Sequence, residues 1–478
     1  YGSSHKGHSE DWALITHRTQ PSQHPVLIRG ARTLAYVLQH RRRTVRLVLT
    51  VAIVVSVALL AHGAATAPTT ASAESVPEAP PRENVTVVTE SAKHGTIIAW
   101  RPDGSLLYYD DAHTKYFDVD PVAGTRYTVE YVATDTVHSR GPTCASPPCV
   151  RNVVERANLS TGHVETVYAR YDRHERAGEW HDHVRIDDRH VLIADIIDDQ
   201  VFVVNTETEV VTWLWDAQSD YPLAGGGPYP DDWTHLNDVE VLDDGRVMVS
   251  LRNQDQVVFL DRETGLLENW TLGAEDDHDV LHEQHNPDYI PAERGGPAVL
   301  VADSENGRVV EYHREGEGWR RTWEWSDRRL QWPRDADRLP NGNTLIADTH
   351  GKRVLEVAPN GTVVWSVPVS HPYDVERLGT GAESASGESA RRLGLESRTG
   401  ATAGEGGDPL AILADVLTAP LPSRWVNAAI YLAPVWMGRL QFFAAGVGLF
   451  AVLSWIGLEL SWRLGDAGVG LRWPVYRK

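Results

Sequence analysis

The chain has 478 residues, 42% of them hydrophobic and 23% charged, so it can bury a substantial core. Its formal net charge is -21, which excludes nucleic acid as the expected partner, because phosphate backbones bind basic surfaces. Only five of its 45 basic residues are lysine, a balance typical of proteins kept soluble in strong salt. A halophilic source, or a base composition that favours arginine codons, explains this balance.

An apolar run at residues 47–67 predicts a first transmembrane helix, because a bilayer takes about 20 apolar residues to cross. The preceding segment, 1–46, ends in the basic cluster Arg41, Arg42, Arg43 and Arg46. The positive-inside rule therefore places 1–46 in the cytoplasm and the following residues outside. A cleaved signal peptide is the alternative, given the small residues near the end of the run. Residues 68–89, rich in Ala, Thr and Pro, predict a stalk.

One pattern recurs five times: an aromatic ring, two residues, then Asp (His183 in the first copy) and a strand. The copies begin 55, 50, 47 and 39 residues apart, a spacing typical of four-stranded propeller blades, at Trp180, His235, His285, Trp332 and His371. Hairpins that end in aromatic residues lie between the copies, with two weaker ones at 115–131 and 150–171. Six such hairpins predict an all-β, six-bladed β-propeller over residues 90–378. The opening at His371 has no hairpin after it, so we expect it to complete the first blade.

The remaining segments suggest how the propeller is attached. Residues 379–408 are rich in Gly, Ser, Ala and Glu and predict a flexible linker. An amphipathic or interfacial region follows at 409–439, then a second transmembrane helix at 440–462 and a cytoplasmic tail at 463–478. Both termini would then be cytoplasmic and the propeller extracytoplasmic. There, Cys144 and Cys149, five residues apart, are expected to form a disulfide.

The hairpin between Asp231 and Asp261 brings an imidazole, an amide and a guanidinium to one sheet edge, from His235, Asn237 and Arg252. Inner strands of a propeller begin on one rim of the central channel, so the openings of all blades should converge there. We therefore expect one funnel lined by His181 or His183, His235, His285, His371, and Trp332 with Arg334. The simpler interpretation is that the rings only pack and the Asp residues cap neighbouring amides.

Clustered histidines also raise the possibility of a metal site. The pairs His181-x-His183 and His282-Glu-Gln-His285 are the candidates, but the second is one residue short of the HExxH spacing. Neither pair is completed by a set of carboxylates or thiolates in the sequence. We expect no metal.

Five segments resemble the arylsulfotransferase family, which needs no nucleotide donor: HDHVRI, DWTHLNDVEV, VSLRNQDQV, EQHNPDYI and WPRDADRLPNGNTLIAD. The resemblance is carried by separate motifs and covers most of residues 94–378. It implies a six-bladed propeller in which a channel histidine accepts a sulfuryl group from a phenolic sulfate ester and passes it to a phenol, without a cofactor.

By motif, His285 matches the sulfated histidine, His235 and Asn237 its neighbours, and Arg252 the arginine. His181 matches the remaining histidine, with His183 as a rival, and Thr349 is the candidate for the family's hydroxyl. A small-molecule aryl sulfate is thus the expected partner, bound by a membrane-embedded protein. The alternative is a tethered propeller that binds an anionic or aromatic ligand, or an envelope protein, without chemistry.

Overall fold

The computed structural model describes residues 25–66, 70–92, 95–172, 178–400 and 421–467. The chain forms two compact units. One comprises Tyr1–Val57 with Val447–Lys478, and the other comprises Ala58–Gly446.

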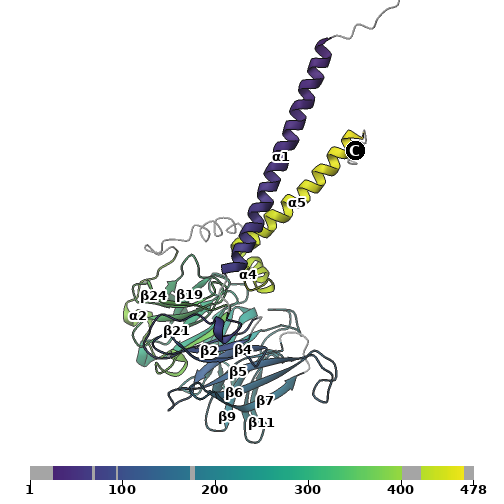
Figure 1. The fold of residues 1–478 in the computed structure, drawn as a ribbon. Helices are drawn as coiled ribbons and strands as arrows, with labels where there is room; N and C mark the ends of the chain where they lie inside the picture. Colours follow the sequence, from purple (N-terminus) through teal and green to yellow (C-terminus); the bar gives the residue numbers. More distant parts are fainter. Residues whose placement is uncertain (1–24, 67–69, 93–94, 173–177, 401–420, 468–478) are drawn as a thin grey trace, which may run out of the picture. The chain divides into compact units, whose positions relative to one another are not determined.

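The larger unit contains six antiparallel sheets, which confirms the six-bladed propeller (Figure 1). The first three blades, from the innermost strand outwards, are β25 (Pro372–Arg377), β1 (Thr86–Glu90), β2 (Thr96–Trp100), β3 (Leu106–Asp110); β4 (Lys115–Pro121), β5 (Thr128–Val137), β6 (Cys149–Asn158), β7 (His163–Asp172); and β8 (Trp180–Arg185), β9 (His190–Asp195), β10 (Gln200–Asn205), β11 (Val210–Asp216).

The other three blades follow in chain order. They are β12 (Leu236–Val241), β13 (Val247–Leu251), β14 (Gln256–Asp261) with β15 (Gly265–Leu266) and β16 (Leu272–Gly273); β17 (His285–Ile290), β18 (Ala298–Asp303), β19 (Arg308–Glu315), β20 (Gly318–Trp325); and β21 (Pro333–Arg338), β22 (Thr344–Asp348), β23 (Arg353–Val357), β24 (Val363–Pro368). Short helices in the same unit are η1 (Ala73–Ser75), η2 (Ala217–Ser219), η3 (Arg252–Gln254), η4 (Glu268–Trp270), η5 (Ala292–Arg294), η6 (Ala382–Ser384), α2 (Ala390–Leu393) and α4 (Ser423–Leu432).

The ring closes as the sequence predicts, because the last strand completes the first blade. β25 pairs with β1 in an antiparallel register that sets Val87 opposite Glu376. Between blades, apolar side chains of facing sheets interlock; Leu192, Val203 and Val249, for example, are at most 1% exposed and belong to one core cluster. This closure ties the amino-terminal strand of the propeller to its carboxyl-terminal strand and leaves no inner strand unpaired.

Carboxylates of the inner strands join neighbouring blades. Asp182 accepts the backbone N–H of Val239 at 2.5 Å, and Asp374 accepts that of Val119 at 2.7 Å. Burial and neighbouring carboxylates raise the pKa of Asp182 well above its ordinary value. The simpler interpretation of the repeated Asp, that it caps neighbouring amides, therefore holds for Asp374, and Asp182, one residue before the repeat position His183, makes the same kind of contact.

Two sequence predictions differ from the structure. Lys115–Tyr131 is not an outer hairpin: it contains β4, the innermost strand of its blade, and the start of β5. The start of β4 lacks the repeated pattern of a ring, two residues and an Asp that marks the other inner strands. Phe117 is the aromatic residue that this strand directs to the channel instead. Residues 379–400, expected to be flexible, pack on the propeller: Ser384 and Ser389 are fully buried, and Ala390 donates its N–H to Glu311. The side chains of these two serines are buried because each accepts a hydrogen bond from a backbone N–H group. The rest of that linker lies outside the described residues.

The smaller unit consists mostly of two long helices, α1 (Pro25–Thr66) and α5 (Arg439–Asp466), whose other ends belong to the larger unit. Within it, Arg42 pairs with Asp466 at 2.7 Å and Arg46 with Glu459 at 2.5 Å. The segments Tyr36–Thr66 and Arg439–Asp466 contain 18-residue stretches with mean hydropathies of 2.4 and 1.8 and are long enough to cross a membrane. α1 begins at Pro25, well before the apolar run at residue 47.

Candidate active site

A cavity of about 370 Å³ lies where the inner strands begin. Residues at or just before the blade openings form most of its wall, and helix α4 adds three side chains. Ser91, Arg252 and Glu305, which follow β1, β13 and β18, complete it. Its lining consists of Ser91, Lys115, Phe117, Glu179, His181, Asp232, His235, Arg252, Glu283, Glu305, Trp332, Arg334, Arg424, Ala428 and Tyr431. Of the residues predicted to line one funnel, His181, His235, Trp332 and Arg334 belong to this wall, beside acidic groups and Phe117.

Local backbone irregularity aims the rings at this cavity. His235 and Trp332 have left-handed φ values of 47° and 54°, and the pairing register of each inner strand shifts just after them. A shift of this kind redirects the first side chain away from the regular alternation of the strand. The remainder of the strand can then pack in the propeller while its first ring faces the cavity.

His285 lies behind this wall, completely buried. Its ring centroid is 6.4 Å from that of His235 and 6.0 Å from that of Trp332. Its Nδ1 atom lies 2.8 Å from the Oγ atom of Ser304, whose hydroxyl lies 2.6 Å from the carbonyl oxygen of Pro333. A carbonyl only accepts, so the Ser304 proton is committed there and its oxygen accepts the Nδ1–H of His285. The proton therefore sits on Nδ1, and Nε2 carries the lone pair.

The Nε2 atom of His285 is buried and has no hydrogen-bond partner within the described parts of the chain. Burial, and then the positive charges of Arg334 and Arg252, lower the pKa of His285 well below its ordinary value. At neutral pH the imidazole is therefore uncharged, with an unpaired nitrogen lone pair. Such a ring is a competent nucleophile.

His235 differs from His285 because its ring nitrogen faces a carboxylate. The Nδ1 atom of His235 lies 2.6 Å from Asp232. Burial and Arg252 lower the pKa of His235, and Asp232 opposes them. Burial would raise the pKa of Asp232, but the charges of His235 and Arg252 lower it to about 2. Asp232 is therefore ionised and stabilises the protonated form of His235, the arrangement suited to an acid or base.

His181 completes a row of rings with His235 and Tyr373. Its centroid is 5.0 Å from that of His235, and its Nδ1 atom lies 3.3 Å from the hydroxyl of Tyr373. Phe117 stacks on its other side, with centroids 4.3 Å apart. Burial and the charge of His235 lower the pKa of His181 well below the ordinary value, so it too is neutral at pH 7.

Two arginines supply positive charge to the cavity. Arg334 is 5% exposed; it donates to the hydroxyl of Ser91 at 2.7 Å, and its Cζ atom lies 4.3 Å from the ring centroid of Trp332. Arg252 pairs with Glu283 at 2.9 Å. The Nε atoms of both guanidiniums are buried without a hydrogen-bond partner among the described residues. They are donors of the kind that bind a sulfate or sulfuryl group.

Other predicted residues lie away from the cavity wall. Asn237 is fully buried and donates to the carbonyl of Gln284 at 2.9 Å. His371 is 1% exposed and its ring faces His350 at 6.0 Å. Thr349 donates its hydroxyl to the carbonyl of Pro372 at 2.7 Å, which links two blades. In this structure these three side chains support the site from behind.

The histidine pairs considered for a metal do not converge. His181 faces the cavity, whereas His183, its rival in the motif, lies 2.5 Å from Asp118. His282 stacks on His278 at 3.8 Å, while His285 contacts Ser304. Two groups do bring ligand-type atoms within 4.8 Å of one another and could hold a cation: the buried Asp118, Asp182 and His183, and the more exposed Asp255, Asp276 and His278.

Sequence reasoning missed several contributors. Phe117 and Lys115 belong to the one inner strand that lacks the template, and Tyr373 comes from the strand that closes the ring. Ser304 had a usable signal, because ADS at 302–304 and ADT at 347–349 occupy the same place in successive blades. No sequence signal pointed to the contribution of α4, because its residues lie far from the propeller strands in the sequence.

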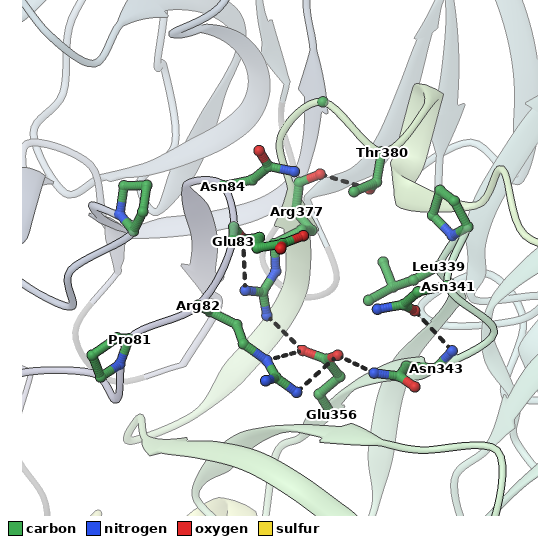
Figure 2. Close-up of a pocket in the computed structure, with 13 residues that line it drawn as sticks. Pro81, Arg82, Glu83, Asn84, Leu339, Asn341, Asn343, Glu356, Arg377 and Thr380 are labelled. Atoms are coloured by element: carbon green, nitrogen blue, oxygen red, sulfur yellow. Dashed lines mark hydrogen bonds and ion pairs between the residues drawn. The ribbon is translucent and has the colours of Figure 1, made fainter.

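A larger cavity, of about 820 Å³, lies at Arg82, Leu339 and Arg377 (Figure 2). Its charged groups bond to one another: Glu356 accepts from Arg82 at 2.9 Å, from Arg377 at 3.2 Å and from Asn343. Among the described residues, the Nε atom of Arg377 is left buried without a hydrogen-bond partner. This network ties the segment before β1 to β23 and β25. It therefore has the character of a structural clasp, while the histidine cavity has donors and lone pairs to spare. Elsewhere in the same unit, Cys144 and Cys149 form a disulfide.

The comparisons with known proteins concern the same part of the chain. The arylsulfotransferase (ASST) family model matches residues 166–370. No curated protein matches the sequence.

Solved structures similar to the chain include the periplasmic gluconolactonase of Pseudomonas aeruginosa (14% identity, 62% of this chain and 99% of that chain, TM-score 0.41), a protein of unknown function from Bacteroides caccae (12%, 61% and 97%, 0.40) and virginiamycin B lyase from Staphylococcus aureus (8%, 49% and 73%, 0.30). No functional conclusion rests on these structures.

Proposed function

Since residues 166–370 carry the arylsulfotransferase (ASST) match, we propose that this protein transfers a sulfuryl group from a phenolic sulfate ester to a phenol, with His285 as the nucleophile. The observation that carries the proposal is the bond between His285 and Ser304. It places the proton on Nδ1 and leaves a buried, unpartnered Nε2 on a neutral ring beside two arginines.

In the first half-reaction, Nε2 of His285 forms a bond to sulfur as the bond from sulfur to the aryl oxygen breaks. The leaving phenolate takes a proton from His235, whose protonated form Asp232 stabilises. In the second, the oxygen of the acceptor phenol attacks sulfur, its proton passes to His235, and the nitrogen–sulfur bond breaks. The covalent intermediate on His285 divides one difficult transfer into two easier steps.

The sulfuryl oxygens carry negative charge throughout the transfer. Arg334 and Arg252 offer buried N–H donors toward them, and donors fixed in a site that excludes water stabilise such charge strongly. Trp332 and Phe117 provide flat apolar surface for an aryl ring. Transfer to His285 also requires its Nε2 atom to meet the substrate through the wall formed by His235 and Trp332.

The two apolar helices support a location of this activity at a membrane. We propose that both span the bilayer, with the basic segment before residue 47 and the tail after residue 462 in the cytoplasm and the propeller on the extracytoplasmic side. The disulfide between Cys144 and Cys149 supports this orientation, because disulfides persist in oxidising compartments.

The test uses the full chain in detergent at high salt, with 4-nitrophenyl sulfate as donor and phenol as acceptor. Without acceptor, we expect an added sulfuryl mass that maps to His285 and disappears when phenol is supplied. His285→Ala should abolish both nitrophenol release and the adduct.

His313→Ala is the matched control. His313, on β19, is also buried, but its ring nitrogens make hydrogen bonds with the backbone carbonyls of Gly295 and Arg314. It should keep the adduct. An adduct on His235 would reassign the nucleophile. Neither adduct nor nitrophenol release from a folded protein would favour a propeller that binds its ligand without chemistry.

A further inference from the structure

Helix α4 contributes to the cavity although it lies outside both the propeller strands and the family match. Three of its side chains, those of Arg424, Ala428 and Tyr431, form part of the cavity wall. They are spaced four and three residues apart and so form one stripe of the helix. The ring of Tyr431 lies 5.8 Å from that of Trp332, edge to face. An aryl group in this cavity would therefore touch α4 as well as the blades.

A second face of α4 is anchored to the propeller. Asn427 is 3% exposed: its amide oxygen accepts from Gln331 at 3.0 Å, and its amide nitrogen donates to Glu305 at 2.9 Å. Val426 and Ile430 are buried on the same side. After the helix, the carbonyl of Val435 accepts from the ammonium group of Lys352. These contacts hold α4 in one register over the cavity.

The third face of α4 is apolar and exposed. Trp425 is 76% exposed and Leu432 is 83% exposed, and their spacing of seven residues puts them on one side of the helix. Large apolar side chains at this exposure are normal singly, but a pair on one helical face marks a surface that meets another apolar phase.

The short connection between α4 and α5 indicates which apolar phase the exposed face of α4 meets. α5 begins at Arg439, so residues 433–438 alone connect α4 to a membrane-spanning helix. A connection of this length reaches at most about 20 Å when fully extended. Covalent geometry therefore keeps α4 close to the bilayer surface, where a helix with an apolar face lies in the interface.

We propose that α4 is an interfacial helix, seated in the bilayer surface by Trp425 and Leu432, and that Arg424 and Tyr431 complete a binding site for an amphiphilic phenol or phenolic sulfate drawn from the membrane. The occupant of the exposed face is thus the bilayer. The inference about substrate rests on the proposed sulfuryl transfer, whereas the seating of α4 does not. A substrate with a phenolic head and an alkyl tail fits, because the head meets Trp332 and Tyr431 while the tail stays in lipid.

The seating of α4 can be measured without any turnover. Both native cysteines are joined in a disulfide, so Trp425→Cys introduces a single free thiol for the fluorophore NBD. In the full chain reconstituted in phosphatidylcholine vesicles, we expect the label to be quenched by doxyl lipids. Leu214→Cys, from an exposed residue of β11, is the matched control and should stay unquenched. Equal, weak quenching at both positions would overturn the seating of α4.

The substrate class is tested by kinetics in the same vesicles, with 4-nitrophenyl sulfate as donor and either phenol or membrane-borne 4-dodecylphenol as acceptor. The double variant Trp425→Ser/Leu432→Ser should lower kcat/KM for dodecylphenol by at least about tenfold, since the apolar contact that seats the helix is lost. Its kcat/KM for phenol should not change. Leu214→Ser/Val364→Ser, on exposed propeller strands, should change neither.

Equal losses on both acceptors would show a merely structural role for the exposed face, and no loss on either would overturn the inference while the sulfotransferase proposal stands. If the wild type turns over neither acceptor, the proposed function and the substrate class fail together, and the quenching result still decides the seating of α4. Tyr431→Ala should raise KM for both acceptors, because it removes a side chain that forms part of the cavity wall.

Discussion

The ring of His285 and the hydroxyl of Ser304 form a hydrogen bond of 2.8 Å that decides which imidazole nitrogen is free. Ser304 lies at the end of β18 and His285 at the start of β17, which pair within one blade. The same hydroxyl lies 2.6 Å from the carbonyl of Pro333 in the next blade. One serine therefore links two blades and fixes the tautomer of the proposed nucleophile.

Ser304→Ala should lower kcat by about 10²-fold or more, because the histidine loses the group that holds its tautomer. The loss of the bond to Pro333 should cost only about 1 kcal/mol of stability. Thr349→Val provides the control, since Thr349 makes the equivalent bond to Pro372 at 2.7 Å. Comparable melting temperatures with unequal kcat would support the tautomer role, and equal kcat losses would refute it.

Arg334→Met should separate activity from stability. Arg334 is buried, donates to the neutral hydroxyl of Ser91 and forms no ion pair in the described parts of the chain, and burial lowers its pKa. We expect kcat/KM to fall by about 10²–10³-fold through loss of a fixed donor. The melting temperature should hold or rise, since a buried cation without a carboxylate partner is costly.

Arg353→Met is the contrasting substitution. Arg353 is equally buried but lies 2.8 Å from both Asp327 and Asp348. Its removal leaves buried carboxylates unpaired and should cost about 3–5 kcal/mol. If Arg334→Met destabilises the protein to the same degree, Arg334 holds the fold rather than the substrate.

Asp232→Asn should make the reaction more sensitive to the leaving group. Without the carboxylate, burial and Arg252 lower the pKa of His235 further, so it donates a proton less readily at neutral pH. Turnover of phenyl sulfate, with its more basic leaving group, should fall more than turnover of 4-nitrophenyl sulfate. The alkaline limb of the pH profile for transfer from the donor, where His235 loses its proton, should also move to lower pH. Equal losses on the two esters would exclude His235 as the proton donor.

Contact between α4 and the propeller should weaken as pH rises through about 7. Burial raises the pKa of Glu305 to about 7, with Glu283 also raising it and Asn427, Arg252 and Ser423 lowering it. In water the same carboxyl titrates near its usual value of about 4.3. A raised pKa means that docking of α4 is favoured most below pH about 4.3 and loses that contribution as pH passes 7.

Hydrogen exchange of the α4 amides, corrected for intrinsic rates, checks this expectation. Exchange should be faster at pH 8 than at pH 6 in the wild type and independent of pH in Glu305→Gln. Glu315→Gln, an exposed glutamate of β19, should behave as the wild type. A pH dependence that survives Glu305→Gln would point to another group.

The amino-acid sequence by itself determined the repeat, the number of blades and the closure of the ring at His371, because these follow from short-range alternation and regular spacing. It also singled out His181, His235, Arg252, Trp332 and Arg334, since equivalent positions of successive blades must meet on one rim. It could not distinguish His181 from His183, because a register shift at the start of β8 decides which ring faces the cavity.

The other contributors to the site depend on contacts between segments that lie far apart in the chain. Tyr373 and Phe117 reach the histidines through pairings between distant segments, and such contacts leave no periodic trace in sequence. The partner of Asn237 proved to be a backbone carbonyl of the next blade. The place of α4 over the cavity depends on three contacts of Asn427 with Gln331, His350 and Glu305, from two different blades. Long-range packing, rather than local pattern, therefore completes this site.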